Sequence, residues 1–420
     1  MARVPSLPPA LRHDAFRRLW VSMLCSSVAM QMAQVAIGWQ VYSIHHHAFD
    51  LGLIGLAEFV PVPLLALPAG HLADRLPRVG LVIVTGLGDA AVAGLLLVVT
   101  LRGANELWQF VALAALTGTI SALGSPAQRS LVPELVPTDL LTGAVALRSI
   151  AGQVATIGGP ALGGFLFAVR PEAVYAAAGV MLVVASLVLV PVTRPEAAAL
   201  EAAEKAGLQT LFAGVRFIRS TPVILGAITL DLFAVLFGGA VALLPLFARS
   251  VLHTGPFGLG VLRSMVAVGA LVAGVRLARR PLGGRAGRTL LLVVGTFGAS
   301  MVVFGLSRWF WLSALALAVS GFADMFSMNI RSTTVALATP NRLLGRVNAV
   351  ENVFIGASNE LGAFESGAAA ALLGATPAVV AGGALTIALA LVWPRLFPAL
   401  AAVDRLDRLR PAGDPVPVEA

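Results

Sequence analysis

Residues 55–83, GLAEFVPVPLLALPAGHLADRLPRVGLVI, form the stretch that decides the fold. Two apolar segments are joined here by a short polar corner that carries Asp74, Arg75 and Arg78. A helix needs about 20 apolar residues to cross a bilayer, and it satisfies its own backbone hydrogen bonds there. The stretch therefore predicts two helices that cross a membrane and turn at one of its surfaces.

The composition of the whole chain supports a membrane protein. Of its 420 residues, 58% are hydrophobic and 12% are charged, whereas about a quarter of the residues of a soluble domain are charged. The chain has room for about twelve spans, and these leave nothing for a soluble catalytic domain. The single cysteine, Cys25, lies in the first apolar run and is interpreted as a packing residue.

The net charge of +8 is explained by topology. If the amino terminus is cytoplasmic, most of the 29 Lys and Arg residues lie on the cytoplasmic side, which is the positive-inside rule. Both termini are therefore predicted to be cytoplasmic, and we expect anionic membrane lipid as a partner rather than nucleic acid. The basic segments placed on this side are the amino-terminal tail, 75–78, 129, 194–219, 276–288, 331–346 and 395–410.

A polar stretch near the middle divides the chain into two halves. Its apolar positions suggest an amphipathic helix on the inner membrane surface. Six spans, a surface linker and six further spans are expected for two pseudo-symmetric bundles. The predicted parts are a cytoplasmic tail (1–15), a six-helix bundle (16–192), a linker (193–221), a second six-helix bundle (222–397) and a second tail (398–420).

Two spans have features that bear on their geometry. The second span, about 51–73, contains Pro61, Pro63 and Pro68, which free backbone carbonyls and bend a helix. The seventh span is expected to run over about 222–247.

Polar side chains at membrane depth are the first candidates for a substrate cavity. Ser27, Gln31 and Gln34 recur on one face of the first helix. They line a cavity or hold the bundle together by hydrogen bonds between helices. Arg148 and Arg263 are cavity candidates that would attract an anionic substrate, or they pair with buried acids.

Acidic residues at the same depth are candidates for proton coupling, which requires a buried carboxylate that can gain and lose a proton. Another cavity candidate, Asn329, lies in the same helix as one of these acids. The acids are Glu58, Asp89, Asp231, Asp324 and Glu360. Of these, Asp89 is interpreted as a structural hydrogen-bonding group.

Residues 148–164, RSIAGQVATIGGPALGG, predict a helix with one face of very small volume. Gly152, Gly159 and Gly163 lie on this face, and Pro160 and Gly164 stand beside it. A second helix can approach closely there.

These stretches resemble a known family. Residues 70–78, GHLADRLPR, resemble the signature between the second and third helices of the major facilitator superfamily of secondary transporters, with Pro77 where the family prefers glycine. Residues 159–164, GPALGG, look like the fifth-helix signature of its drug/proton antiporters.

Three further stretches are similar to the branch that contains the enterobactin exporter and macrolide-efflux permeases. They are FRRLW at 16–20, SPA at 125–127 and PNRLLGRVN at 340–348. The resemblance implies an all-α membrane protein with twelve helices in two bundles, alternating access, and proton-driven export of a siderophore or an amphipathic drug-like compound. It also implies a monomer in a bacterial inner membrane, with no cofactor and no metal.

The resemblance assigns roles to individual residues. Gly70, Asp74, Arg75 and Arg78 would form a conformational switch, although the two arginines could be positive-inside anchors and Asp74 a turn residue. The helices expected to line the cavity make Asp231 the leading proton-coupling candidate, with Asp324 and Glu58 behind it. Asp231 could also be a static partner for a neighbouring helix.

Three alternatives remain open at this stage. A lipid or lysophospholipid flippase would need a lateral opening. A membrane-embedded enzyme would need clustered nucleophiles or metal ligands, and the six histidines lie mostly in loops without a companion acid. A receptor would need a signalling domain. We expect a transporter and not an enzyme.

Overall fold

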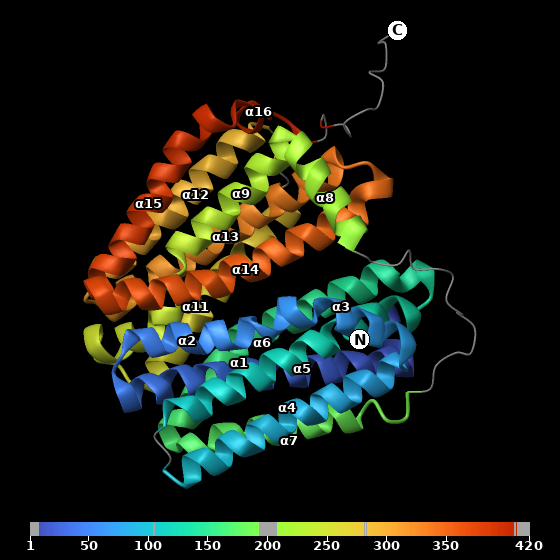
Figure 1. Ribbon diagram of the computed structural model, residues 1–420, viewed down its shortest axis with the longest axis vertical. Coiled ribbons are helices and arrows are strands. Elements are labelled where there is room, and N and C mark those ends of the chain that lie inside the picture. Colours follow the sequence, from blue (N-terminus) through green and yellow to red (C-terminus); the bar gives the residue numbers. More distant parts are fainter. Residues whose placement is uncertain are drawn as a thin grey trace, which may run out of the picture. The chain divides into compact units, whose positions relative to one another are not determined.

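The computed structural model describes residues 8–103, 106–192, 208–280, 282, 284–406 and 409. Within these ranges it does not describe the side chains of residues 66, 67, 71, 73, 74, 208–213, 341 and 352. The described residues form helices and turns, with no β-strand among them (Figure 1). By contact the chain divides into two compact units. Unit 1 comprises Met1–Ala203 and Leu244–Ser264, and unit 2 comprises Glu204–Leu243 and Met265–Ala420.

Unit 1 is built from long apolar helices joined by short turns. Helix α1 packs against α6 and α7, while α5 packs against α2, α3 and α4. Its elements in the first segment are η1 (Pro9–Arg12), α1 (Asp14–His45), α2 (Ala48–Phe59), α3 (Pro61–Arg75), α4 (Arg78–Leu101), α5 (Leu107–Glu134), η2 (Thr138–Leu140), α6 (Leu141–Val169) and α7 (Pro171–Leu187). The later segment Leu244–Ser264 adds α10 (Leu244–Leu246) and the π-helical turn η4 (Phe247–Val251).

The predicted proline bend lies between α2 and α3. Helix α2 ends at Phe59, and α3 begins at Pro61, whose missing N–H fits the first position of a helix. The residue between them, Val60, keeps right-handed helical dihedral angles, so the two helices are parts of one bent span. Pro68 lies within α3.

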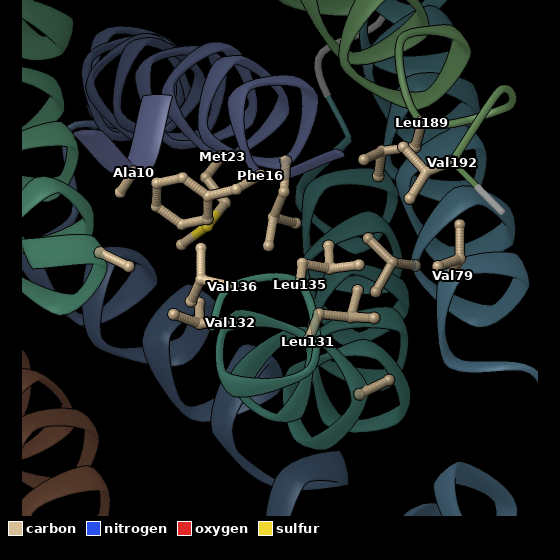
Figure 2. Close-up of a cluster of buried hydrophobic side chains, with 14 of the residues drawn as sticks. Ala10, Phe16, Met23, Val79, Leu131, Val132, Leu135, Val136, Leu189 and Val192 are labelled. Carbon is tan, nitrogen blue, oxygen red and sulfur yellow. The ribbon is translucent and has the colours of Figure 1, made fainter. Parts of the chain in front are cut away.

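A buried apolar cluster closes the end of unit 1 where α1 begins and α5 ends (Figure 2). Phe16 of α1 is fully buried there, against the end of α5 that carries Leu131 and Val132. Val79 of α4 and Leu189 after α7 complete the packing. Helices in a bilayer are held together mainly by van der Waals packing, and the close packing of these side chains stabilises this end of the unit.

Unit 2 has its own helical core, in which α12 packs against α13 and α15, and α9 packs against α14 and α15 (Figure 1). Its elements are α8 (Leu208–Ser220), α9 (Pro222–Gly238), η3 (Ala240–Leu243), the greater part of α11 (Pro256–Arg279), α12 (Ala286–Leu306), α13 (Phe310–Ala338), α14 (Asn341–Leu373), α15 (Ala375–Leu396) and α16 (Pro398–Ala401).

The seventh span is found as Pro222–Val251, close to the predicted 222–247, but it is not one regular α-helix. Helix α9 ends at Gly238, and Gly239 has non-helical dihedral angles. The Gly239 carbonyl accepts a hydrogen bond of 3.3 Å from the Ser366 hydroxyl of α14. Two consecutive glycines disfavour helix, and a side-chain donor satisfies the carbonyl freed by the break.

The helices have the lengths that membrane crossing requires. Within the described residues, ten are long and apolar enough to span a bilayer. Helix α7 is apolar but shorter, and the long helix α14 carries several charged residues. Together with these two, twelve helical segments among the described residues correspond to the predicted spans.

Candidate functional site

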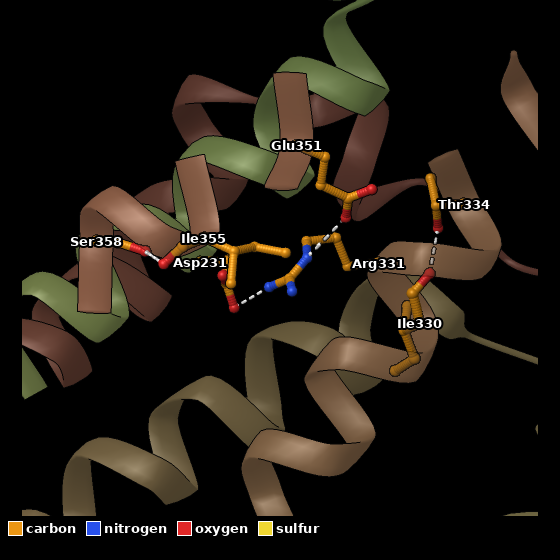
Figure 3. A network of polar contacts seen from close by, with 7 residues as sticks. All are labelled: Asp231, Ile330, Arg331, Thr334, Glu351, Ile355 and Ser358. Carbon is orange, nitrogen blue, oxygen red and sulfur yellow. Dashed lines mark hydrogen bonds and ion pairs between the residues drawn. The ribbon is translucent and has the colours of Figure 1, made fainter. Parts of the chain in front are cut away.

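A buried network of charged side chains joins three helices of unit 2 (Figure 3). Arg331 of α13 forms an ion pair with Asp231 of α9. The Nε group of Arg331 also donates a hydrogen bond of 3.2 Å to Glu351 of α14. One guanidinium therefore holds acids from two other helices.

All three side chains are shielded by the protein. The exposed fraction is 4% for the Arg331 side chain, 11% for Asp231 and 9% for Glu351. Removing an ion from water costs several kcal/mol even after relaxation. The guanidinium lies between the two acids and offsets part of this cost.

A third acid stands beside this network. Asp324 precedes Arg331 on α13 by seven residues, so both lie on one face of that helix. Asp324 is exposed into a small pocket that is also lined by Asp231 and Ser327, and it is close enough to the Asp231–Arg331 pair to interact with both charges. Three carboxylates thus face one guanidinium.

Sequence reasoning missed two members of this cluster. We predicted Arg331 to lie with the basic segment 331–346 on the cytoplasmic side, but its side chain is buried in an ion pair. Glu351 was not proposed for any role. The seven-residue spacing from Asp324 to Arg331 was a usable signal, because it places an acid and a base on one helical face at membrane depth.

A second polar cluster lies within unit 1. The Arg263 guanidinium donates a hydrogen bond of 2.7 Å to Gln34 of α1. Glu58 of α2 is close enough for its charge to interact with that of Arg263, and Asp89 of α4 is close enough to interact with Glu58. Of the sequence candidates, the structure therefore brings Gln34, Glu58 and Arg263 together.

The position of Arg263 is fixed by the contact of α11 with α6. The next residue, Ser264, donates a hydrogen bond of 2.6 Å to the carbonyl of Ile157. A Cβ placed on Gly164 would lie 2.4 Å from the carbonyl oxygen of Pro256. A Cβ on Gly260 would likewise lie 2.3 Å from the Pro160 carbonyl oxygen. The two backbones touch because neither glycine has a side chain.

The opposite contact of α6 is with α1. A Cβ on Gly159 would lie 2.6 Å from Gln31 Cβ, and a Cβ on Gly163 would lie 2.8 Å from Met32 Cα. Gly152 differs, since no described atom lies within 4 Å of its Cβ position. The packing role predicted for this face is therefore proposed for the second half of α6.

The other cavity candidates are placed apart from these clusters. Arg148 of α6 is partly buried and interacts with the like charge of Arg129 of α5. Asn329 is partly buried on α13, two residues before Arg331. Gln31 is partly buried beside the glycine face.

The hairpin that suggested a switch is only partly described. The Asp74 side chain lies outside the described residues, Arg75 is exposed at the end of α3, and no described atom lies within 4 Å of a Cβ placed on Gly70. Arg78, at the first position of α4, forms an ion pair with Glu134 at the end of α5.

Together, a chain of membrane-crossing helices with buried charge clusters is typical of a transporter. The chain belongs to the transmembrane secretion effector family, whose model matches residues 5–416. Like the members of that family it is a transporter and not an enzyme. Over 346 residues it is 28% identical to the enterobactin exporter EntS of Citrobacter koseri, a match that covers 80% of each chain.

Solved structures show the same fold. A mutant form of the nucleoside transporter NupG is matched with a TM-score of 0.74 at 11% identity, over 91% of this chain and 100% of that one. A bacterial homologue of the human lysosomal transporter Spinster is matched with a TM-score of 0.71 at 14% identity, over 94% and 96%. The predicted major facilitator fold is confirmed.

Proposed function

We propose that this protein exports a small molecule, a siderophore or an amphipathic drug-like compound, in exchange for protons. The relatives named as enterobactin exporters support the direction of transport and the first of these substrate classes. Alternating access, with both termini in the cytoplasm and one chain as the working unit, is part of the proposal. We expect membrane lipid to surround the helices.

The observation that carries proton coupling is the charge cluster of unit 2. Asp231 and Glu351 share the single guanidinium of Arg331, and Asp324 lies close by. If all three acids were ionised, negative charge would exceed positive charge in a buried site. A proton reduces that excess, so the cluster supports reversible protonation.

A proton bound at Asp231 would act on helix contacts. Neutral Asp231 loses its ion pair, and Arg331 is then held by Glu351 alone. Since these side chains lie on α9, α13 and α14, the change alters the contacts of three helices. A difference in interaction free energy between two conformations is what biases a two-state equilibrium, and here protonation supplies it.

Substrate contacts are assigned to polar groups that can face a cavity. Gln31, Gln34, Arg148, Arg263 and Asn329 remain the candidates. Arg263 is the most favourable for an anionic substrate, because it carries a guanidinium charge at membrane depth and Gln34 orients that group through a hydrogen bond of 2.7 Å.

Export can be tested in cells that make enterobactin but lack their own exporter. The chain is expressed there, and enterobactin is measured inside the cells and in the medium. We expect secretion to be restored and the intracellular pool to fall. A matched strain carrying the Asp231→Asn variant should not secrete.

The same strains separate the substrate classes. Resistance to a macrolide without enterobactin secretion would assign the chain to drug efflux. Outward movement of a labelled lysophospholipid, with neither of the other two activities, would replace export of a soluble compound by lipid flipping.

A further inference from the structure

We propose that Glu58 and Asp89, beside Arg263, form a proton-binding site in unit 1 that is separate from the acid cluster of unit 2. Nothing in the proposed function requires it, since one titrating cluster is enough for proton antiport. The site would give unit 1 its own response to pH.

Helix α5 places the two acids at a similar depth. A Cβ on Gly118 would lie 1.9 Å from the backbone carbonyl oxygen of Glu58, so α2 lies directly against α5 there. A Cβ on Gly88, the neighbour of Asp89, would lie 3.2 Å from the side chain of Ile120. Two residues of helix rise only about 3 Å, so Glu58 and Asp89 flank α5 at nearly one level.

The cation of the site is held in place by two contacts. Gln34 accepts a hydrogen bond of 2.7 Å from the Arg263 guanidinium, and the neighbouring Ser264 donates a hydrogen bond of 2.6 Å to the Ile157 carbonyl. Arg263 is therefore fixed where its charge acts on Glu58. The site contains two carboxyl groups for one guanidinium.

Asp89 is the acid of the pair whose charge is not compensated. Its Oδ1 atom is buried and has no hydrogen-bond partner among the described residues. A shielded oxygen without a donor is costly when the carboxylate is ionised. One proton on the pair removes this cost, and Glu58 and Arg263 remain as compensating charges.

The described residues of α7 that pack against α4 around Asp89 carry no charge. Helix α7 packs against α4, where Gly86 faces Ser186 and Gly179 faces Ala93, and the residues of α7 between these contacts are apolar. On α5, the hydroxyl groups of Thr117 and Thr119 donate to carbonyls of their own helix. The charge of Arg263 acts on Glu58, and the charge of Glu58 acts on Asp89. A proton on Glu58 therefore changes the charge that acts on Asp89.

The test is infrared difference spectroscopy on the full-length protein in lipid vesicles, comparing acidic with alkaline buffer in the absence of substrate. We expect the wild type to show a carbonyl stretch from a buried protonated carboxyl group of unit 1. Asp89→Asn should remove this band, because it leaves Glu58 beside Arg263 as the other acid of the pair. Glu58→Gln should keep the band but move its midpoint to lower pH, because the like charge that acts on Asp89 is then absent. Arg263→Gln should roughly double it.

The controls separate this site from the rest of the protein. Glu106→Gln removes an exposed acid of unit 1, and Asp231→Asn changes only the cluster of unit 2. Both should leave the unit 1 band unchanged. Gel filtration identifies any variant that does not fold, and each of the three site variants then tests the proposal without the others.

The proposal is overturned if the band survives in Asp89→Asn, or if Glu58→Gln leaves its midpoint pH unchanged. Because no substrate is present, this result is independent of export. Loss of enterobactin transport with an intact band would count against the proposed function alone.

Discussion

Arg331 of α13 is ion-paired with Asp231 of α9, and both residues are buried. The same guanidinium also binds Glu351 of α14. A single cation thus connects three helices of unit 2, and a change in charge at either acid alters contacts on all of them.

Removal of the cation should destabilise the protein strongly. Arg331→Met leaves two buried carboxylates without a partner, and we expect a loss of about 3–5 kcal/mol in the free energy of unfolding. Thermal or denaturant unfolding of the purified protein in detergent measures it.

A double-mutant cycle supplies the control. Arg331→Met combined with Asp231→Asn should cost less than the sum of the two single changes, because the double variant has no unpaired charge at Asp231. Strict additivity would show that the pair does not interact.

Removal of the Asp231 carboxylate should abolish proton coupling without preventing folding. Asp231→Asn preserves the shape of the side chain but cannot carry the proton, so pH-driven efflux should be lost while the protein stays in the membrane at the wild-type level. Transport and membrane abundance are measured in the same vesicles. Asp139→Asn, an exposed acid in η2, is the matched control and should transport normally.

The glycine face of α6 gives a prediction with a control in the same helix. Gly164→Ala places a methyl group 2.4 Å from the Pro256 carbonyl oxygen, and such overpacking typically costs about 1–3 kcal/mol. Gly152→Ala meets no described atom and should be neutral or stabilise by up to about 1 kcal/mol. The unfolding temperatures of the two variants, measured under the same conditions, test this prediction. Equal values would be inconsistent with close packing at Gly164.

The ion pair of Arg78 with Glu134 links the ends of α4 and α5. Glu134→Gln should lower the free energy of unfolding by about 1–3 kcal/mol, since it removes a charge-assisted hydrogen bond. Arg78→Gln should have a similar effect, and the double variant should be little worse than either. Glu106→Gln, at the other end of α5, should have no effect in the same unfolding assay.

The fold could be predicted from the sequence because the bilayer leaves few choices. Long apolar runs must be helices, and the charges between them fix the turns, so the twelve spans follow from composition. The proline bend at Val60 could also be predicted from the sequence. The break after Gly238 could not, because its partner, the Ser366 hydroxyl, lies 127 residues away in the chain.

The candidate site was only partly predictable for the same reason. Asp231 and Asp324 stand out as acids in apolar runs, whereas Arg331 lies near enough to the end of its helix to be interpreted as an anchor at the membrane surface. Which acid meets which base depends on helix packing. Glu58, Asp89 and Arg263 lie on three different helices, and no spacing in the sequence relates them.

The most direct test of proton-driven export uses purified protein in vesicles loaded with enterobactin and a pH-sensitive dye. An imposed pH gradient should drive enterobactin across the membrane with an opposite flow of protons, and Asp231→Asn should abolish both flows together. Equal enterobactin movement with and without the gradient, or in Asp231→Asn, would contradict the account.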